Sequence, residues 1–292
     1  AGVPGCRPDR VRSAAGGLGL VLRQARVAQD GAGGDVQPRR LSAADLDDLS
    51  GLALTRLAGR LDADIALDRA GGRQDAAVRA TGSGLQGAGI GLGRLDADLR
   101  LRDLRGLPLL DGRLDADRLV AGGESLDTIR LAAIGGAEAS DVTLRAKARG
   151  FDLDGAARLS AGKPARVLVS RLTAARGGDR LSLAGPASFA LSEGSVAIEG
   201  LSIAAGAGRL DLSGRVGETL DLAFAARALP LSISRIVAPG LGLTGTLDGR
   251  AQVAGPATRP EGHYEIALTR VASAETRQAG LPPIEARASG IV

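Results

Sequence analysis

The sequence predicts an all-β protein built as one long, strongly curved, mostly one-layered sheet with one or two short helices. Three observations lead to this class. Short runs alternate apolar and polar residues, glycine-rich breaks separate the runs at close intervals, and large side chains are scarce in an otherwise apolar composition. A period of two is typical of strands with one buried and one wet face, and closely spaced glycines are typical of tight turns.

The clearest strand is SDVTLRAKARG at 140–150, where the apolar residues fall on one face and the charged residues on the other. RLDADIALD at 60–68 and RLDADLRLRD at 94–103 repeat the pattern. About fifteen or more such runs occur, and no shift of composition marks a domain boundary. We therefore expect a single elongated, repetitive β region over 1–292.

Repeats are present in style but not in period. GRLDAD occurs at 59–64, 93–98 and 112–117, so its copies start 34 and then 19 residues apart. A strict solenoid has a fixed coil length and needs a fixed period. The uneven spacing favours strands added one after another to a long sheet.

Two segments carry helix signals. Ser42 can cap a two-turn helix at about 43–50, with Leu41 and Leu46 spaced as a hydrophobic staple. A second short helix is expected at about 232–238, ended by Pro239.

The kind of apolar residue suggests how the sheet is used. Apolar residues make up 44% of the chain, yet it has only 3 Phe, 1 Tyr and no Trp or Met. A closed core normally gains much of its buried area from aromatic side chains. A long sheet lined by Leu, Ala, Val and Ile can instead curl into an open trough, and an apolar surface of that size needs a partner. The fitting partner is an acyl chain.

The residues predicted to line this groove are the apolar members of the alternating runs. They are Leu61, Ala63, Ile65, Leu67, Leu95, Leu99, Leu114, Val142, Leu144, Val167, Val169, Leu181, Leu183, Val196, Ile198, Leu210, Leu212, Leu220, Leu222, Phe224, Val253, Ile266 and Leu268.

The carboxylate pairs of the GRLDAD copies are predicted to lie on the solvated face. Residues i and i+2 of a strand share a face about 6.6 Å apart, too far apart and too few for calcium, which takes six to eight oxygens. An arginine precedes each pair by two residues (Arg60, Arg94, Arg113) and is the expected ion-pair neighbour. We expect no metal site.

Other chemical motifs are incomplete. Gly82, Gly84 and Gly87 match a dinucleotide fingerprint, but the following residues continue as a strand, whereas the motif requires a helix. His263 is the sole histidine and begins a predicted strand without a nucleophile elbow nearby. Cys6 has no partner for an internal disulfide. We expect neither catalytic residues nor a cofactor.

Charge and hydropathy exclude two further classes. The net charge is +4, but the basic residues are interleaved with acidic ones and bases would find few aromatic rings to stack on. We therefore expect no nucleic-acid partner. No apolar run reaches the roughly 20 residues of a spanning helix, and residue 1 is not Met, so we expect a processed or internal piece of a longer protein.

From Lys163 onward the succession of elements is similar to a known family. LAGPASFAL, then GRLDLSGRV, then ALPLSISRIVAPGLGLTGTLDGRAQVAGPATRPEG resembles the TamB-type translocation and assembly module proteins, which are related to AsmA-like, bridge-like lipid-transfer proteins. The resemblance is clearest over 163–275, and residues 1–162 agree in style only.

The resemblance implies the middle section of a periplasmic protein anchored in the inner membrane of Gram-negative bacteria. It implies a β-taco-like groove that conducts phospholipids between the two membranes in outer-membrane biogenesis. It also implies a TamA-like outer-membrane barrel as partner, contacted through parts absent from this chain. The family carries no catalytic residues. The alternatives from the sequence are a structural or adhesive β-solenoid with a closed core, and an enzyme on a β scaffold.

Overall fold

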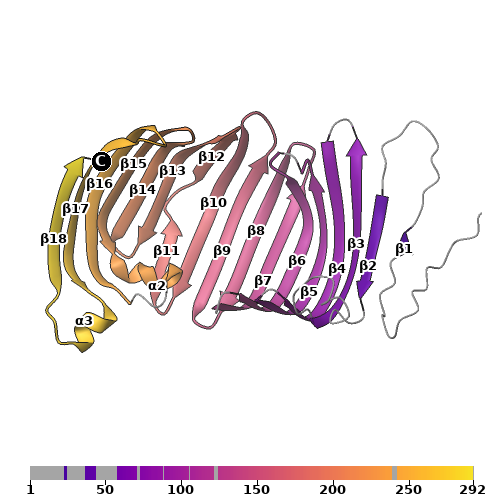
Figure 1. The fold of residues 1–292 in the computed structure, drawn as a ribbon, viewed down its shortest axis with the longest axis horizontal. Coiled ribbons are helices and arrows are strands. Elements are labelled where there is room, and N and C mark those ends of the chain that lie inside the picture. Colours follow the sequence, from indigo (N-terminus) through magenta and orange to yellow (C-terminus); the bar gives the residue numbers. More distant parts are fainter. Residues whose placement is uncertain are drawn as a thin grey trace, which may run out of the picture.

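The computed structural model describes residues 23–24, 37–43, 58–70, 73–87, 89–104, 106–121, 124–238 and 242–291. These residues form one antiparallel sheet of 18 strands with two short α-helices (Figure 1). The prediction of an all-β fold is therefore confirmed.

The first nine strands are β1 (Arg23–Gln24), β2 (Gln37–Ala43), β3 (Ala58–Ala70), β4 (Arg73–Gly87), β5 (Ile90–Arg102), β6 (Leu109–Ala121), β7 (Glu124–Gly135), β8 (Ala139–Ala148) and β9 (Phe151–Ser160). The others are β10 (Ala165–Arg176), β11 (Asp179–Leu183), β12 (Ala187–Ser192), β13 (Ser195–Ala205), β14 (Gly208–Val216), β15 (Thr219–Pro230), β16 (Thr244–Pro256), β17 (Glu261–Ala272) and β18 (Ile284–Ile291).

Strands that follow one another in the chain pair with each other except at β11 and β12, because β10 has two partners on one side. Residues 165–169 of β10 pair with β12, residues 173–176 pair with β11, and both short strands pair in turn with β13. β11 and β12 therefore share one position in the sheet. Among the described residues no second sheet packs on this one, and the strands lie side by side as one layer (Figure 1).

The helices are short segments that connect consecutive strands. A 3-10 turn η2 (Leu231–Ile233) runs into α2 (Ser234–Val237), which confirms the helix predicted at about 232–238. The sequence reading missed α3 (Ala274–Gln278), which Ser273 caps reciprocally with Thr276. The helix predicted at 43–50 lies outside the described residues, apart from Ala43 at the end of β2.

Bulges interrupt the regular pairing at several places. Ala228 has φ +44 where the pairing of β15 with β16 shifts, and the facing Gly208 is so close that a Cβ there would lie 2.3 Å from the Ala228 carbonyl oxygen. Arg270 at φ +52 and Gly245 form the same combination between β16 and β17. Bulges of this kind bend a strand and increase its twist, so the glycines serve curvature as well as turns.

One glycine-rich stretch lies within a strand and not in a turn. The glycine-rich stretch 82–87 continues β4, and the pairing with β5 runs on to Gly87. Gly84 takes φ +60 within the strand, so the irregular residue is absorbed without ending the pairing. No helix begins there, whereas the dinucleotide motif would require one.

The buried residues are small. Twelve of the fifteen buried apolar residues among those described are alanines, and the largest fully buried side chain is that of Ser140. Two packed sheets would bury bulky side chains between them. This pattern instead fits a single layer in which small side chains are covered by their larger neighbours.

Candidate apolar binding face

One side of the sheet is a continuous apolar surface, called the apolar face below. The register sets its residues in rows that cross the strands. One row contains Ile65, Val78 and Leu99, and continues through Gly112 and Ala133 to Val142, Ala157 and Val169. A second row joins Leu212, Phe224 and Ala251 across β14 to β16. Side chains on such rows are direct cross-strand neighbours.

All 23 predicted lining residues fall on this face, because alternation within strands and the register between them agree. The prediction missed further members, among them Val78, Ile129, Leu131, Leu201 and Ile203. The same period of two marks them in β4, β7 and β13, so the signal was present in the sequence.

The large side chains on the apolar face are incompletely covered. In the cluster of β3 to β5, Ala63, Ala80 and Ala97 are buried, while Leu61, Val78 and Leu95 pack around them and stay half-buried. In the same strands Ile65 is 37% exposed and Leu67 38% exposed. The alanines are therefore covered by their neighbours, and the neighbours have no layer above them.

One part of the apolar face is covered. Residues 231–237, which form η2 and α2 and are called the strap below, connect β15 to β16. Ile233 of the strap packs on Ala205, Ala226 and Leu229, which are 1%, 3% and 6% exposed. Figure 1 shows α2 in front of the sheet beside β11.

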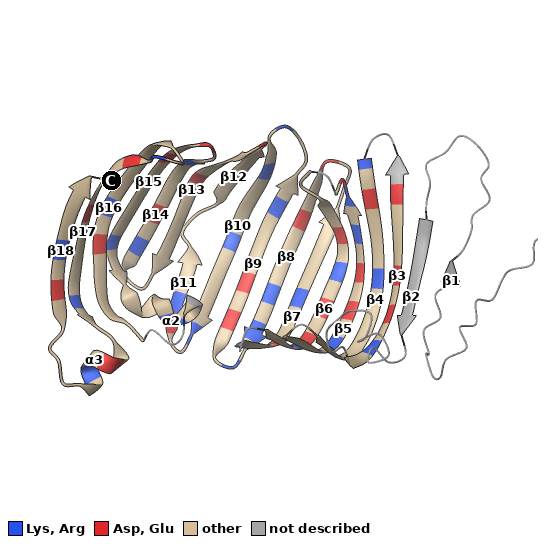
Figure 2. Cartoon of the chain, viewed as in Figure 1, with Lys and Arg blue, Asp and Glu red and all other residues tan. Residues whose placement is uncertain are grey.

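The other side of the sheet, called the charged face below, carries charged side chains that form ion pairs between neighbouring strands. Figure 2 shows Lys and Arg interspersed with Asp and Glu across the strands. Several of the pairs join directly opposite residues, as in Arg79–Asp98 at 3.2 Å and Arg130–Asp115 at 3.5 Å. These two carboxylates belong to GRLDAD copies and bind arginines of adjacent strands, rather than those of their own strand.

Asp154, on the charged face, binds two arginines. The Arg171 guanidinium donates to Oδ1, and Arg145 Nε donates to Oδ2 at 3.0 Å. The hydrogen bond from Arg171, with that from Arg145, lowers the pKa of Asp154 below its ordinary value, because both favour the charged carboxylate.

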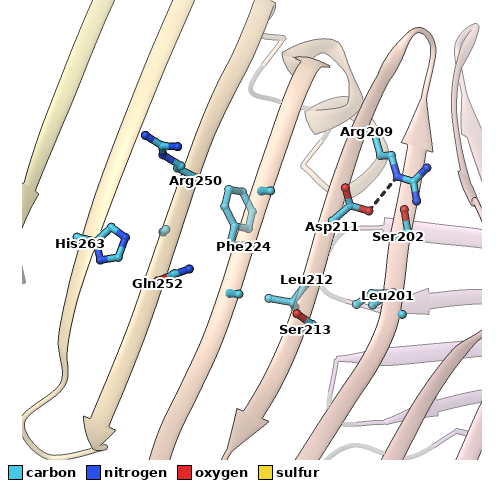
Figure 3. Close-up of a pocket in the computed structure, with 14 residues that line it drawn as sticks. Leu201, Ser202, Arg209, Asp211, Leu212, Ser213, Phe224, Arg250, Gln252 and His263 are labelled. Carbon is cyan, nitrogen blue, oxygen red and sulfur yellow. Dashed lines mark hydrogen bonds and ion pairs between the residues drawn. The ribbon is translucent and has the colours of Figure 1, made fainter.

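A shallow depression of about 370 Å³ lies over β13 to β17 (Figure 3). Its polar lining belongs to the charged face and includes Arg209, bound to Asp211 at 2.8 Å, and His263. The Ser202 hydroxyl and the Arg209 guanidinium lower the pKa of Asp211.

In this depression Ser213 and His263 lie too far apart to share a proton. The register places three strand spacings between Ser213 and His263, which is about 14 Å. A general base has to lie within hydrogen-bond reach of the proton it takes. Glutamine and alanine side chains occupy the positions between the two residues.

Within the described ranges, no group of three or more His, Cys, Asp or Glu side chains could hold an ion. No helix within those ranges is long and apolar enough to cross a bilayer. Cys6 lies outside the described residues.

Comparison of the chain with protein-family models, with curated proteins and with solved structures finds no match.

Proposed function

We propose that this chain is a segment of a periplasmic bridge that carries phospholipids between the inner and outer membranes, with acyl chains lying on the apolar face. The observation that carries the proposal is the extent of that face. From β3 to β17 there are fourteen strand positions, and their thirteen spacings of about 4.8 Å span roughly 62 Å.

The apolar area that these dimensions give is too large to remain exposed to water. Strands of about 12 residues reach roughly 40 Å, so the face covers on the order of 2,500 Å². A soluble monomer exposes apolar patches of about 300–600 Å² at most. Even with the strap covering one part, a surface several times that limit requires an apolar occupant.

An acyl chain fits this surface better than a protein does. The hydrocarbon core of a bilayer is roughly 30 Å thick, so one chain of about 15 Å lies easily across the strands. The face offers branched aliphatic side chains and few hydrogen-bonding groups, which suits a ligand that has none. The charged face meanwhile keeps the outside wet, as a segment crossing an aqueous compartment needs.

A closed β-solenoid is the weaker candidate. Its coils stack parallel strands, whereas every pairing of the described strands is antiparallel. The alanine-rich burial and the half-exposed leucines also argue against a dry closed core.

The experiment uses two neighbouring alanines of β9 that point to opposite faces. Ala157 lies on the apolar face between Val142 and Val169, and Ala156 lies on the charged face between Thr143 and Arg171. The delipidated chain is titrated with a phosphatidylethanolamine that carries a fluorescent acyl chain. Ala157→Arg should weaken uptake at least several-fold, and Ala156→Arg should leave it unchanged. Failure of the wild-type chain to take up the probe would overturn the proposal.

A further inference from the structure

The strap is an unusual connection in this sheet. Most neighbouring strands are joined by short turns, such as Gly177 and Gly178 between β10 and β11, or Gly206 and Ala207 between β13 and β14. The other helical connection among the described residues is 273–283, which contains α3 and joins β17 to β18. The connection between β15 and β16 takes residues 231–243 and brings apolar side chains back onto the sheet.

Those side chains occupy the surface proposed for the ligand. Ile233 packs on the apolar face of β13 to β15, among residues that include Leu210 and Phe224. Ile236 is itself buried, at 8% exposure. The strap therefore removes from water the same kind of aliphatic surface that an acyl chain would cover.

A single carboxylate fastens the strap. Asp179, at the start of β11, accepts a hydrogen bond from Ser232 Oγ at 2.6 Å and another from Arg235 Nε at 2.8 Å. The two donors lie 53 and 56 residues away in the chain. Asp179 is the less exposed partner, with 14% of its side chain open to water against 43% for Arg235.

The strap has little stability of its own. It contains one 3-10 turn and one four-residue helix, and neither has a side-chain cap at its N-terminus. So short a helix is unstable in water without tertiary contacts. Its position therefore depends on Ile233, Ile236 and the two bonds to Asp179.

We propose that the strap is a built-in competitor of the acyl chain: the two occupy the same part of the apolar face, over β13 to β15, and Asp179 is the latch that sets how often the strap leaves. The inference rests on the proposed function. It makes the strap an autoinhibitory contact, since lipid enters this section only when the strap is displaced. The apparent affinity for lipid in this section is then the intrinsic affinity multiplied by the fraction of molecules in which the strap is undocked.

The test removes the latch and keeps the rest. Asp179→Ala should strengthen binding of the fluorescent phosphatidylethanolamine about tenfold, since a charge-assisted latch holds the strap down. Asp154→Ala is the matched control, because that carboxylate also holds two side chains but lies on the charged face. Its affinity should equal that of the wild-type chain.

A second measurement needs no variant. Hydrogen exchange of amides 231–238 is followed by mass spectrometry in the wild-type chain with and without the lipid. Saturation should speed exchange of these amides at least fivefold, while exchange in β5 and β6 should slow or stay constant.

The outcomes separate the two proposals. If the wild-type chain and both variants bind the probe equally and strap exchange is unchanged by lipid, the latch is refuted and the lipid-binding face stands. If none of the three binds the probe, the proposed function fails and the strap inference fails with it. Slower strap exchange on lipid binding would also refute competition, because it would make the strap a cover over the bound chain.

Discussion

The sharpest prediction compares two leucines of the apolar face, one under the strap and one in the open. Leu229 is 6% exposed and Leu67 is 38% exposed, so folding removes about 94% and 62% of these residues from water. Full burial of a leucine side chain contributes roughly 1.5–3 kcal/mol. Truncation under a covering layer also leaves a cavity, whereas water fills the gap at an open site.

Leu229→Ala should therefore lower the free energy of unfolding by about 3–4 kcal/mol and Leu67→Ala by about 1 kcal/mol. Urea denaturation followed by circular dichroism measures both, and unchanged slopes would show that the transition keeps its character. Equal losses for the two variants would refute the reasoning, because they would require a second layer of side chains over β3.

Two further predictions concern the backbone and the charged face. Gly112→Ala should lower the free energy of unfolding by at least about 2 kcal/mol, because the glycine has φ +119 and a Cβ would lie 2.0 Å from the Asp98 carbonyl oxygen. The control Gly185→Ala, with open space around it, should be nearly neutral in the same urea titration. Equal losses for the two variants would contradict the close approach at Gly112. For Asp154, the pKa in the folded chain is lowered by Arg171 and Arg145, so its stabilising contribution is present above about pH 4 and is lost as the pH falls through the folded pKa. The stability difference between wild type and Asp154→Asn, less than about 1 kcal/mol for so exposed a group, should shrink on acidification from pH 6 to pH 3, and a difference that grows would reverse the sign of the argument.

Much of the candidate site could be predicted from the sequence, because the alternation of side chains along a strand is a local property. The run at 60–68 places Leu61, Ala63 and Ile65 on one face whatever the rest of the chain does, and the register then aligns such faces. The partners of the acidic pairs were not readable. Asp98 binds Arg79, nineteen residues earlier, because opposition across strands depends on turn length and bulges.

The strap shows the same limit more strongly. The sequence predicts a short helix at about 232–238, and Pro239 gives a local reason for its end. Nothing local indicates that Ile233 turns back onto the sheet or that Asp179 receives Ser232 and Arg235. The missed helix α3 is similar, since its cap joins Ser273 to a threonine in place of the usual acidic or amide residue.

The sequence by itself determined the all-β class, the assignment of side chains to an apolar and a charged face, and most of the turns. These follow from the period of two and from the backbone freedom of glycine, both of which act over a few residues. The tertiary structure alone decided that β11 and β12 share one position, which carboxylate meets which guanidinium, and where the apolar face is covered. Those features depend on contacts between segments up to 56 residues apart. Such contacts are set by the three-dimensional arrangement of the strands and not by the local sequence.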